Sequence, residues 1–288
     1  MNKIDAIIIG AQKAGTTSLK NYLGKHKNIN THLVIEYPYF KDDSEFNKGY
    51  DKSLKKYFDD TSPQDILLAK NIGMYYDETA LRRLKEHNPE CKLILSLREP
   101  LSRTISSYKM EVFNGGINYK FQDIIESVKN KEYDSILYKI FIEQSLYINH
   151  IDKIYKYFPK NQVRFIDFRE LIKDPQSECN RVAKWLGLEE SLKINKEEIH
   201  NKTKAPKSAV YSNILKALRS KDSKLKKLLK KILPYRVFTK FGMLLLELNK
   251  SDKQLSNINS ADIIFLNKYF NPYNKKLKDH TGIDFDKV

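Results

Sequence analysis

Cysteine is scarce in this chain of 288 residues, which contains only Cys91 and Cys179. Cys91 precedes an apolar run and Cys179 lies in a helical pattern, so neither a disulfide framework nor a cysteine metal cluster is supported, and we expect reduced thiols. The ten glycines and nine prolines are scattered, and no stretch has the composition of a flexible linker. We therefore expect one domain that spans residues 1–288.

Long hydrophobic runs are also lacking. The apolar stretch at residues 241–246 is far shorter than the roughly 20 residues that a membrane span needs. The first residues, MNKIDAIIIG, have neither the length nor the cleavage site of a secretory signal peptide. Together these absences predict a soluble, cytoplasmic protein.

Acidic residues are outnumbered: 52 Lys and Arg face 36 Asp and Glu, which gives a net charge of +16. Such an excess favours an anionic partner, but nucleic acid, an acidic membrane surface, a phosphorylated cofactor and an acidic glycan all qualify. Residues 222–233 place leucines on one helical face and lysines on the other. We expect this helix to dock on the protein's own core, with peripheral membrane contact as the alternative.

Strand and helix patterns alternate along the chain. Apolar runs predict strands at residues 4–9, 92–97 and 163–168, and helical patterns follow at 17–24 and 101–111, with a crossover helix at 75–86. A further helix starts at Pro175 and stops at Gly187. This order predicts an α/β fold: a P-loop-containing, doubly wound parallel sheet flanked by helices, with a helical C-terminal part.

The turn after the first strand has the outline of a P-loop, in which the N–H groups and dipole of a helix N-terminus attract an anion. Nucleotide triphosphatases place the loop lysine after the second glycine, beside a hydroxyl residue that holds Mg²⁺. Here Lys13 lies inside the loop and Thr16 and Thr17 follow it. One lysine, two hydroxyls and backbone amides suit an anion with fewer charges than a triphosphate, without a metal.

A second candidate anion site follows the strand at residues 92–97. Arg98 stands at the carboxyl end of that strand and Ser106 eight residues later, about two helical turns on. Ligands of open α/β sheets bind beyond the carboxyl ends of the strands. Both sites are therefore expected to face one crevice.

These motifs resemble those of sulfotransferases that use 3′-phosphoadenosine 5′-phosphosulfate (PAPS). GAQKAGTTSL is similar to the family's 5′-phosphosulfate loop, LREPLSRTISSY to its 3′-phosphate motif, and HNKTKAPKS to the stretch that closes over the 3′-phosphate. The resemblance implies PAPS as donor, 3′-phosphoadenosine 5′-phosphate (PAP) as product and no metal. The donor-binding residues it implies are Gly10, Gln12, Lys13, Ala14, Gly15, Thr16, Thr17, Ser18, Arg98, Ser106 and Lys207, with Lys204 as a competitor of Lys207 and Arg103 matching a further family arginine.

The resemblance also implies a catalytic base. The histidine of the small-molecule branch is absent from residues 70–73, whereas VIEYPYF resembles the KExHFF motif of the carbohydrate branch, which includes the heparan sulfate sulfotransferases. Glu36 is then the base, although Ile35 and Pro38 replace the lysine and histidine of that motif. Lys13 and Lys70 complete the implied catalytic set, and His32 is a weaker alternative base.

The implied reaction is in-line transfer of a sulfuryl group to a hydroxyl or amine of a carbohydrate or glycolipid acceptor, which can be anionic. A P-loop small-molecule kinase is the enzymatic alternative, with Asp167 as its one candidate metal ligand. A polyanion-binding domain is the non-enzymatic alternative, but it leaves both anion motifs unexplained. We expect no nucleic-acid partner, and the sequence leaves the oligomeric state open.

Overall fold

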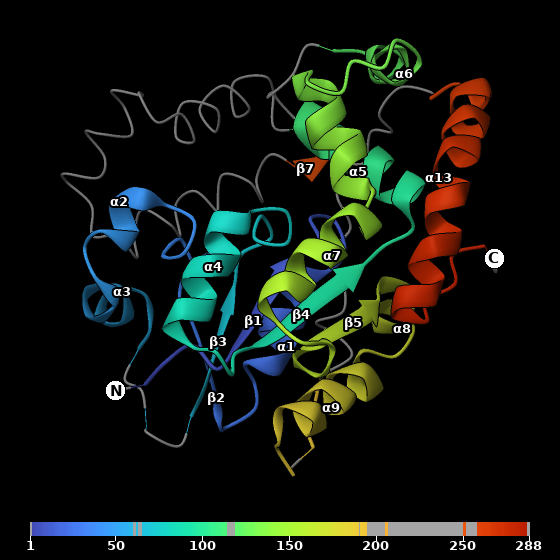
Figure 1. The fold of residues 1–288 in the computed structure, drawn as a ribbon. Coiled ribbons are helices and arrows are strands. Elements are labelled where there is room, and N and C mark those ends of the chain that lie inside the picture. Colours follow the sequence, from blue (N-terminus) through green and yellow to red (C-terminus); the bar gives the residue numbers. More distant parts are fainter. Residues whose placement is uncertain are drawn as a thin grey trace. The chain divides into compact units, whose positions relative to one another are not determined.

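The computed structural model describes residues 2–59, 62, 65–113, 119–189, 191–194, 205–206, 250–251 and 258–286 (Figure 1). The chain divides into two compact units. The first unit comprises Met1–Arg103, Glu143–His200 and Lys268–Val288, and the second comprises Thr104–Ile142 and Asn201–Asn267. Lys207 and the basic segment 222–233 lie outside the described residues.

A five-stranded parallel sheet forms the centre of the first unit, in the order β2-β3-β1-β4-β5. Its strands are β1 (Ala6–Gly10), β2 (Ile29–Thr31), β3 (Ile66–Lys70), β4 (Lys92–Leu97) and β5 (Val163–Asp167). Because the chain starts at the central strand and places its later strands on both sides of it, the sheet is doubly wound, as the sequence predicts.

Helices precede and follow these strands. Those within the first unit are α1 (Thr16–Leu23), α2 (Asp43–Phe46), α3 (Tyr50–Tyr57), α4 (Glu78–His87), α7 (Ile148–Tyr157), α8 (Phe168–Lys173) and α9 (Pro175–Leu186). The second unit contains α6 (Phe121–Lys129), a π-helical turn (Tyr138–Ile142) and a short antiparallel pair, β6 (Ala205–Pro206) with β7 (Lys250–Ser251). Two helices run from one unit into the other, α5 (Pro100–Phe113) and α13 (Ser260–Thr281).

Both faces of the sheet are buried, which explains the continuous apolar run of β1. Side chains of a strand alternate between its two faces. Ile7 and Ile9 join a hydrophobic cluster with residues of α4 and α7. Ala6 and Ile8 join a separate cluster with residues of α1 and α9. The sheet is thus a central layer between helices.

Several boundaries differ from the sequence prediction. The sequence did not indicate β2 or β3. The crossover helix, expected from residue 75, begins at Glu78 because the side chain of Asp77 accepts the N–H of Ala80 and caps α4. Phe168, expected at the end of a strand, is the first residue of α8 for the same reason, since Asp167 accepts the N–H of Arg169.

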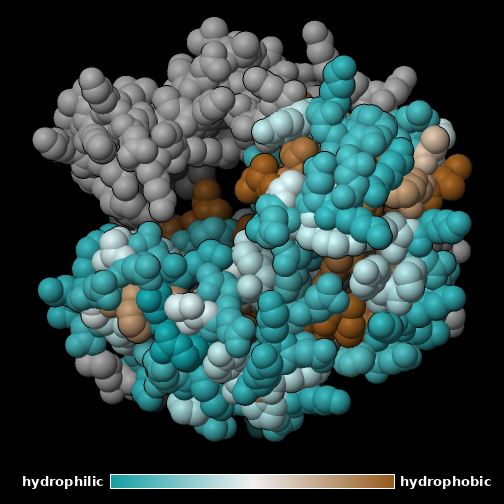
Figure 2. All heavy atoms as spheres, turned by 45° about the horizontal axis from the view of Figure 1, so that its top comes forward, coloured by the Kyte–Doolittle hydropathy of each residue, from teal (hydrophilic) through white to brown (hydrophobic). Residues whose placement is uncertain are grey.

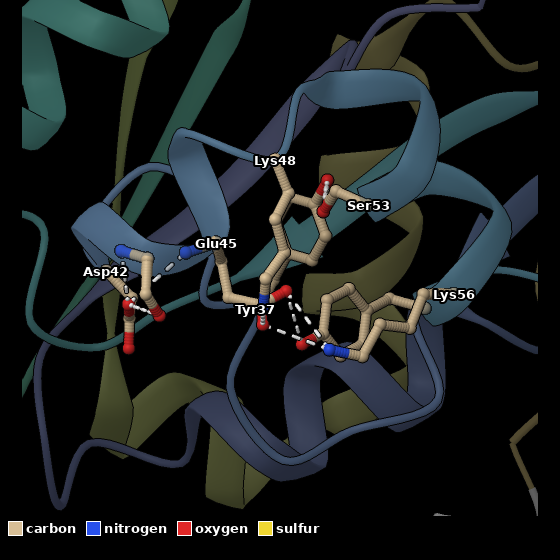
Figure 3. Close-up of polar contacts among 8 residues, drawn as sticks. Tyr37, Asp42, Glu45, Lys48, Ser53 and Lys56 are labelled. Carbon is tan, nitrogen blue, oxygen red and sulfur yellow. Dashed lines mark hydrogen bonds and ion pairs between the residues drawn. The ribbon is translucent and has the colours of Figure 1, made fainter.

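The short helices α2 and α3 are joined by polar contacts around Glu45 (Figure 3). Its carboxylate accepts hydrogen bonds from Lys48 Nζ at 2.6 Å, Lys56 Nζ at 3.0 Å and the Tyr57 hydroxyl at 2.9 Å. Nearby, the hydroxyl of Tyr37 accepts one from Ser53 Oγ at 3.0 Å. These bonds anchor the buried aromatic segment that begins directly after residue 36.

Hydrophilic side chains cover most of the described surface that Figure 2 shows. Large apolar residues with exposed side chains do occur, and two of them, Leu33 and Ile35, lie in one short segment beside Glu36. Among the described residues, no helix combines the length and the apolar character that a membrane crossing requires.

Candidate active site

The glycine-bounded loop lies between β1 and α1, where the sequence places it. Gly15 precedes α1 with φ +74°, a left-handed conformation that suits glycine. A Cβ added at Gly15 would lie 2.8 Å from Cε2 of Phe168, and one added at Gly10 would lie 2.4 Å from Cδ1 of Tyr75. Lys13 is also left-handed, with φ 72°, and such backbone strain in a non-glycine residue is typical of ligand sites.

Contacts with β4 and the residues after it hold the loop in place. The buried hydroxyl of Ser96 donates to the carbonyl of Ala14 at 2.6 Å, and the Ser96 carbonyl accepts the N–H of Ala11 at 2.8 Å. Arg98 donates to the carbonyl of Lys13 at 3.2 Å. The loop carbonyls thus face the protein, which favours an orientation of the loop amides toward a bound anion.

The N-terminus of α1 is free to meet such an anion. No side chain caps this helix, and its first turn contains no acidic residue. The N–H groups of Thr16, Thr17 and Ser18 have no acceptor within the helix, since the first intrahelical bond runs from Leu19 to Gly15. Thr17 is exposed, and Gln12, Lys13 and Ser18 are partly exposed.

Arg98 adds positive charge beside the loop. Its guanidinium stacks 5.0 Å from the ring centre of Phe168. The carboxylate next to it in sequence, Glu99, accepts the N–H groups of Leu101 at 2.8 Å and Ser102 at 2.6 Å and so caps α5. Arg98 can therefore serve an external anion.

Arg103, which the sequence also singles out, is fully buried. It donates to Gln12 Oε1 at 3.2 Å and to Gln144 Oε1 at 2.8 Å. Arg103 therefore orients a loop side chain, a supporting role that its motif did not indicate.

Glu36 and Lys70 form an ion pair at the carboxyl end of β3. The second carboxylate oxygen of Glu36 accepts the N–H of Ile72 at 2.9 Å. The lysine side chain is 1% exposed and the glutamate side chain 31% exposed. Burial lowers the pKa of Lys70, and the contact with Glu36 opposes that shift. The structure thus brings these two predicted residues together, with the carboxylate open to an incoming molecule.

The sheet register sets the ion pair beside the loop. Lys70 on β3 lies opposite Ile8 on β1, two residues before Gly10, and neighbouring strands are about 4.8 Å apart. On the other side of β1, Gly10 lies opposite Leu95 of β4, three residues before Arg98. Three adjacent strand ends therefore carry the ion pair, the loop and the arginine, as expected for a ligand crevice in an open α/β sheet.

Two further residues lie around the ion pair: His32, named from the sequence as a weaker alternative base, and Lys20. His32 is buried, and its Nε2 accepts the backbone N–H of Lys70 at 3.0 Å, so the neutral ring carries its proton on Nδ1. Burial and the ammonium groups of Lys20 and Lys70 lower the pKa of His32 to about 2. His32 is thus a structural acceptor. Lys20, which the sequence analysis did not single out, is buried on α1.

The remaining residues considered in the sequence are Ser106, Asp167 and the two cysteines. Ser106 lies further along α5, in the second unit. Asp167, the metal ligand of the kinase alternative, caps α8 and accepts from the guanidinium of Arg169 at 2.7 Å. Among the residues with described positions, no three His, Cys, Asp or Glu side chains are grouped to hold a metal ion. Cys91 and Cys179 are buried free thiols.

Comparison with known proteins identifies the class. The family described as the sulfotransferase domain matches residues 3–232, and the chain belongs to this family. Human heparan sulfate glucosamine 3-O-sulfotransferase 5 is 31% identical over 188 residues, 64% of this chain and 53% of that protein. Human heparan sulfate glucosamine 3-O-sulfotransferase 3B1 is 30% identical over 203 residues, 69% of this chain and 50% of that protein.

The chain thus aligns with about half the length of these relatives. Among solved structures, a sulfotransferase from Alicyclobacillus acidocaldarius superposes with a TM-score of 0.57 at 16% identity, over 86% of this chain and 96% of that one. That likeness confirms the fold expected from the sequence.

Proposed function

We propose that this chain transfers a sulfuryl group from PAPS to a hydroxyl or amine of a carbohydrate acceptor. The observation that supports this proposal most strongly is the Glu36–Lys70 pair on the strand next to an anion-binding loop. A carboxylate able to accept a proton and a loop able to hold a phosphosulfate are the two parts that such a transfer requires.

The loop residues fit the 5′ end of the donor. The uncapped first turn of α1 offers backbone N–H groups, and Lys13, Thr16 and Thr17 add an ammonium and two hydroxyls. Gly10, Gln12, Ala14, Gly15 and Ser18 complete the proposed cradle. We assign Arg98 and Ser106 to the 3′-phosphate, together with Lys207.

When bound, PAPS supplies the sulfuryl group and a phosphate leaving group. Lys13 is proposed to neutralise the charge that develops on the leaving oxygen. Glu36 is proposed to accept the acceptor's proton, and Lys70 to hold the carboxylate in the orientation that this requires. The bond from Ile72 N–H to Glu36 fixes the other carboxylate oxygen.

A carbohydrate acceptor is supported by the names of the relatives, which act on heparan sulfate. The net charge of +16 is compatible with an anionic glycan. The exposed aliphatic side chains of Leu33 and Ile35, however, flank the proposed base. A glycolipid, which offers a sugar hydroxyl beside apolar groups, therefore remains within the proposed acceptor class.

Thermal unfolding with added nucleotides tests the donor assignment. We expect PAP to stabilise the protein in a chelator, because a ligand that binds only the folded state raises its stability. Lys13→Ala and Arg98→Ala should weaken that effect, whereas Lys52→Met, on the exposed side of α3, should not. Stabilisation by ATP with Mg²⁺ alone would favour a kinase, and a response to polyanions alone would favour a binding domain.

A further inference from the structure

We propose that Lys20 is a positioning residue that ties the Glu36 segment to the helix carrying the donor loop. This inference rests on the proposed function for its consequence in catalysis, and on contacts within the first unit for its geometry. Lys20 lies on α1 and is 8% exposed. Its role is therefore exerted inside the protein.

The ammonium group of Lys20 holds the backbone that leads to the base. Lys20 Nζ donates to the carbonyl of His32 at 2.9 Å and to the carbonyl of Val34 at 3.2 Å. Both carbonyls precede Glu36 by four residues or fewer, in a segment without regular secondary structure. A charge-assisted hydrogen bond is stronger than a neutral one, so Lys20 supplies order that the segment lacks by itself.

The far end of the same segment is held by β3. The Lys70 carbonyl accepts the N–H of Tyr37 at 2.7 Å, and the side chain of Asn71 donates to the Tyr37 carbonyl at 2.9 Å. Lys20 and β3 thus grip the segment on both sides of Glu36. Near Lys20 the segment is also held by the N–H of Leu33, which donates to the Tyr57 carbonyl at 2.8 Å, and by His32 Nε2, which accepts the N–H of Lys70 at 3.0 Å. Removal of Lys20 therefore loosens this end of the segment without releasing it.

The position of Lys20 on α1 gives the contact its significance. Thr16 begins α1 at the donor loop, and Lys20 lies four residues on, so both share a helix face about 6 Å apart along the axis. Both side chains are buried. A single rigid turn therefore connects the loop proposed to hold the donor with the segment that carries the proposed base.

The charges around Lys20 agree with this role. Lys70 and Glu36 both act on it electrostatically, and burial together with Lys70 lowers its pKa to about 8, against the opposing effect of Glu36. His32, the third titratable group beside it, is neutral over the working pH range. Lys20 bears its charge at neutral pH, yet its amine keeps N–H donors for both carbonyls when it is deprotonated.

Two substitutions of similar length separate hydrogen bonding from mere filling of space. Lys20→Met removes the donors, and Lys20→Gln keeps an amide with two N–H groups. Lys52→Met is the surface control. Amide hydrogen exchange of residues 32–37 measures the order of the segment. PAP titration measures the affinity of the donor loop, and kcat for formation of the sulfated acceptor measures the chemical step.

We expect Lys20→Met to speed exchange in residues 32–37 and to lower kcat roughly tenfold or more, because small misplacements of reacting groups are costly. PAP affinity should change little, and Lys20→Gln should recover most of both losses. Equal behaviour of the Met and Gln variants, or unchanged exchange in Lys20→Met, would overturn the inference. If Lys20→Met does not fold, Lys20→Gln decides: wild-type exchange in residues 32–37 supports the role, and fast exchange there overturns it.

The exchange measurement needs no turnover, so it separates this inference from the proposed function. Faster exchange in Lys20→Met with a wild-type protein that transfers no sulfuryl group would support the positioning role and count against the proposed activity. Unchanged exchange in Lys20→Met, together with a wild-type protein that transfers a sulfuryl group, would overturn the positioning role and support the proposed activity.

Discussion

Lys70 lies almost wholly inside the protein while its partner Glu36 keeps about a third of its side chain exposed. The asymmetry matters because a buried cation fixes one carboxylate oxygen, and solvent or a substrate can still reach the carboxyl group. An ion pair on the surface would hold the carboxylate in no fixed orientation, and a fully buried pair would be inaccessible to a substrate. This arrangement suits a base that must meet an incoming hydroxyl.

The conformation of the donor loop depends on Gly15. We expect Gly15→Ala to destabilise the protein by at least about 1–2 kcal/mol, the cost of a left-handed alanine, with an added clash against Phe168. Gly187→Ala is the matched control, because Gly187 is also left-handed, with φ 99° and ψ 15°, but has open space around it. Urea unfolding should show the larger loss for Gly15→Ala, and PAP titration should show lost binding for that variant alone. Equal losses would contradict the packing argument.

Acid should destabilise the protein through its buried histidines. The pKa of His32 falls from 6.5 to about 2, and burial lowers those of His150 and His87 to about 4. Between these values the unfolded chain binds more protons than the folded protein. The contribution of these histidines to stability is therefore complete above pH 6.5 and is lost as the pH falls below it.

The variant His32→Gln isolates one of these protons, because a glutamine can still accept the N–H of Lys70. Urea unfolding at several pH values between 6.5 and about 5 gives the slope of the free energy of unfolding against pH. In His32→Gln this slope should be smaller than in the wild-type protein by up to one proton, about 1.4 kcal/mol per pH unit. A slope equal to that of the wild-type protein would mean that His32 titrates normally.

The contribution of Lys20 to stability should become measurable at alkaline pH. The pKa of Lys20 is lowered from 10.5 to about 8, so between those values the unfolded chain again binds more protons, and the contribution of Lys20 to stability rises with pH. We expect the free energy of unfolding of the wild-type protein, relative to that of Lys20→Met, to increase as the pH rises from 8 toward 10. Lys52→Met should follow the wild-type protein, and parallel curves for all three proteins would contradict the assignment.

Much of this fold could be predicted from the sequence. β1 and β4 are apolar runs buried on both faces, and α9 begins at a proline and ends before a glycine. β2 could not be predicted, since a strand of three residues, Ile29–Thr31, two of them polar, is too short to show a pattern. The loop could be located because its residues are contiguous. The contact between Glu36 and Lys70 could not be derived, because it joins residues 34 positions apart through the register of β3.

Supporting residues are the hardest to foresee. Ser96 interrupts an apolar strand and Lys20 falls on the buried face of α1, between Leu19 and Tyr22. A polar residue at such a position is a usable signal, since buried polar groups need partners. Which partners they find is a property of the folded chain.

The single domain over residues 1–288 and the cytoplasmic location stay predictions. So do the roles of Ser106 and Lys207 at the 3′-phosphate. Substitution of either by alanine should weaken PAP binding without altering the exchange of residues 32–37.

Transfer of labelled sulfate from PAPS to a panel of carbohydrate and glycolipid acceptors tests the central claim most directly. We expect a labelled acceptor with the wild-type protein and a rate lower by about 100-fold or more with Glu36→Gln, while both proteins bind PAP equally. A Glu36→Gln variant that transfers sulfate at the wild-type rate would contradict the role of Glu36, and a wild-type protein that labels no acceptor would contradict the proposed activity.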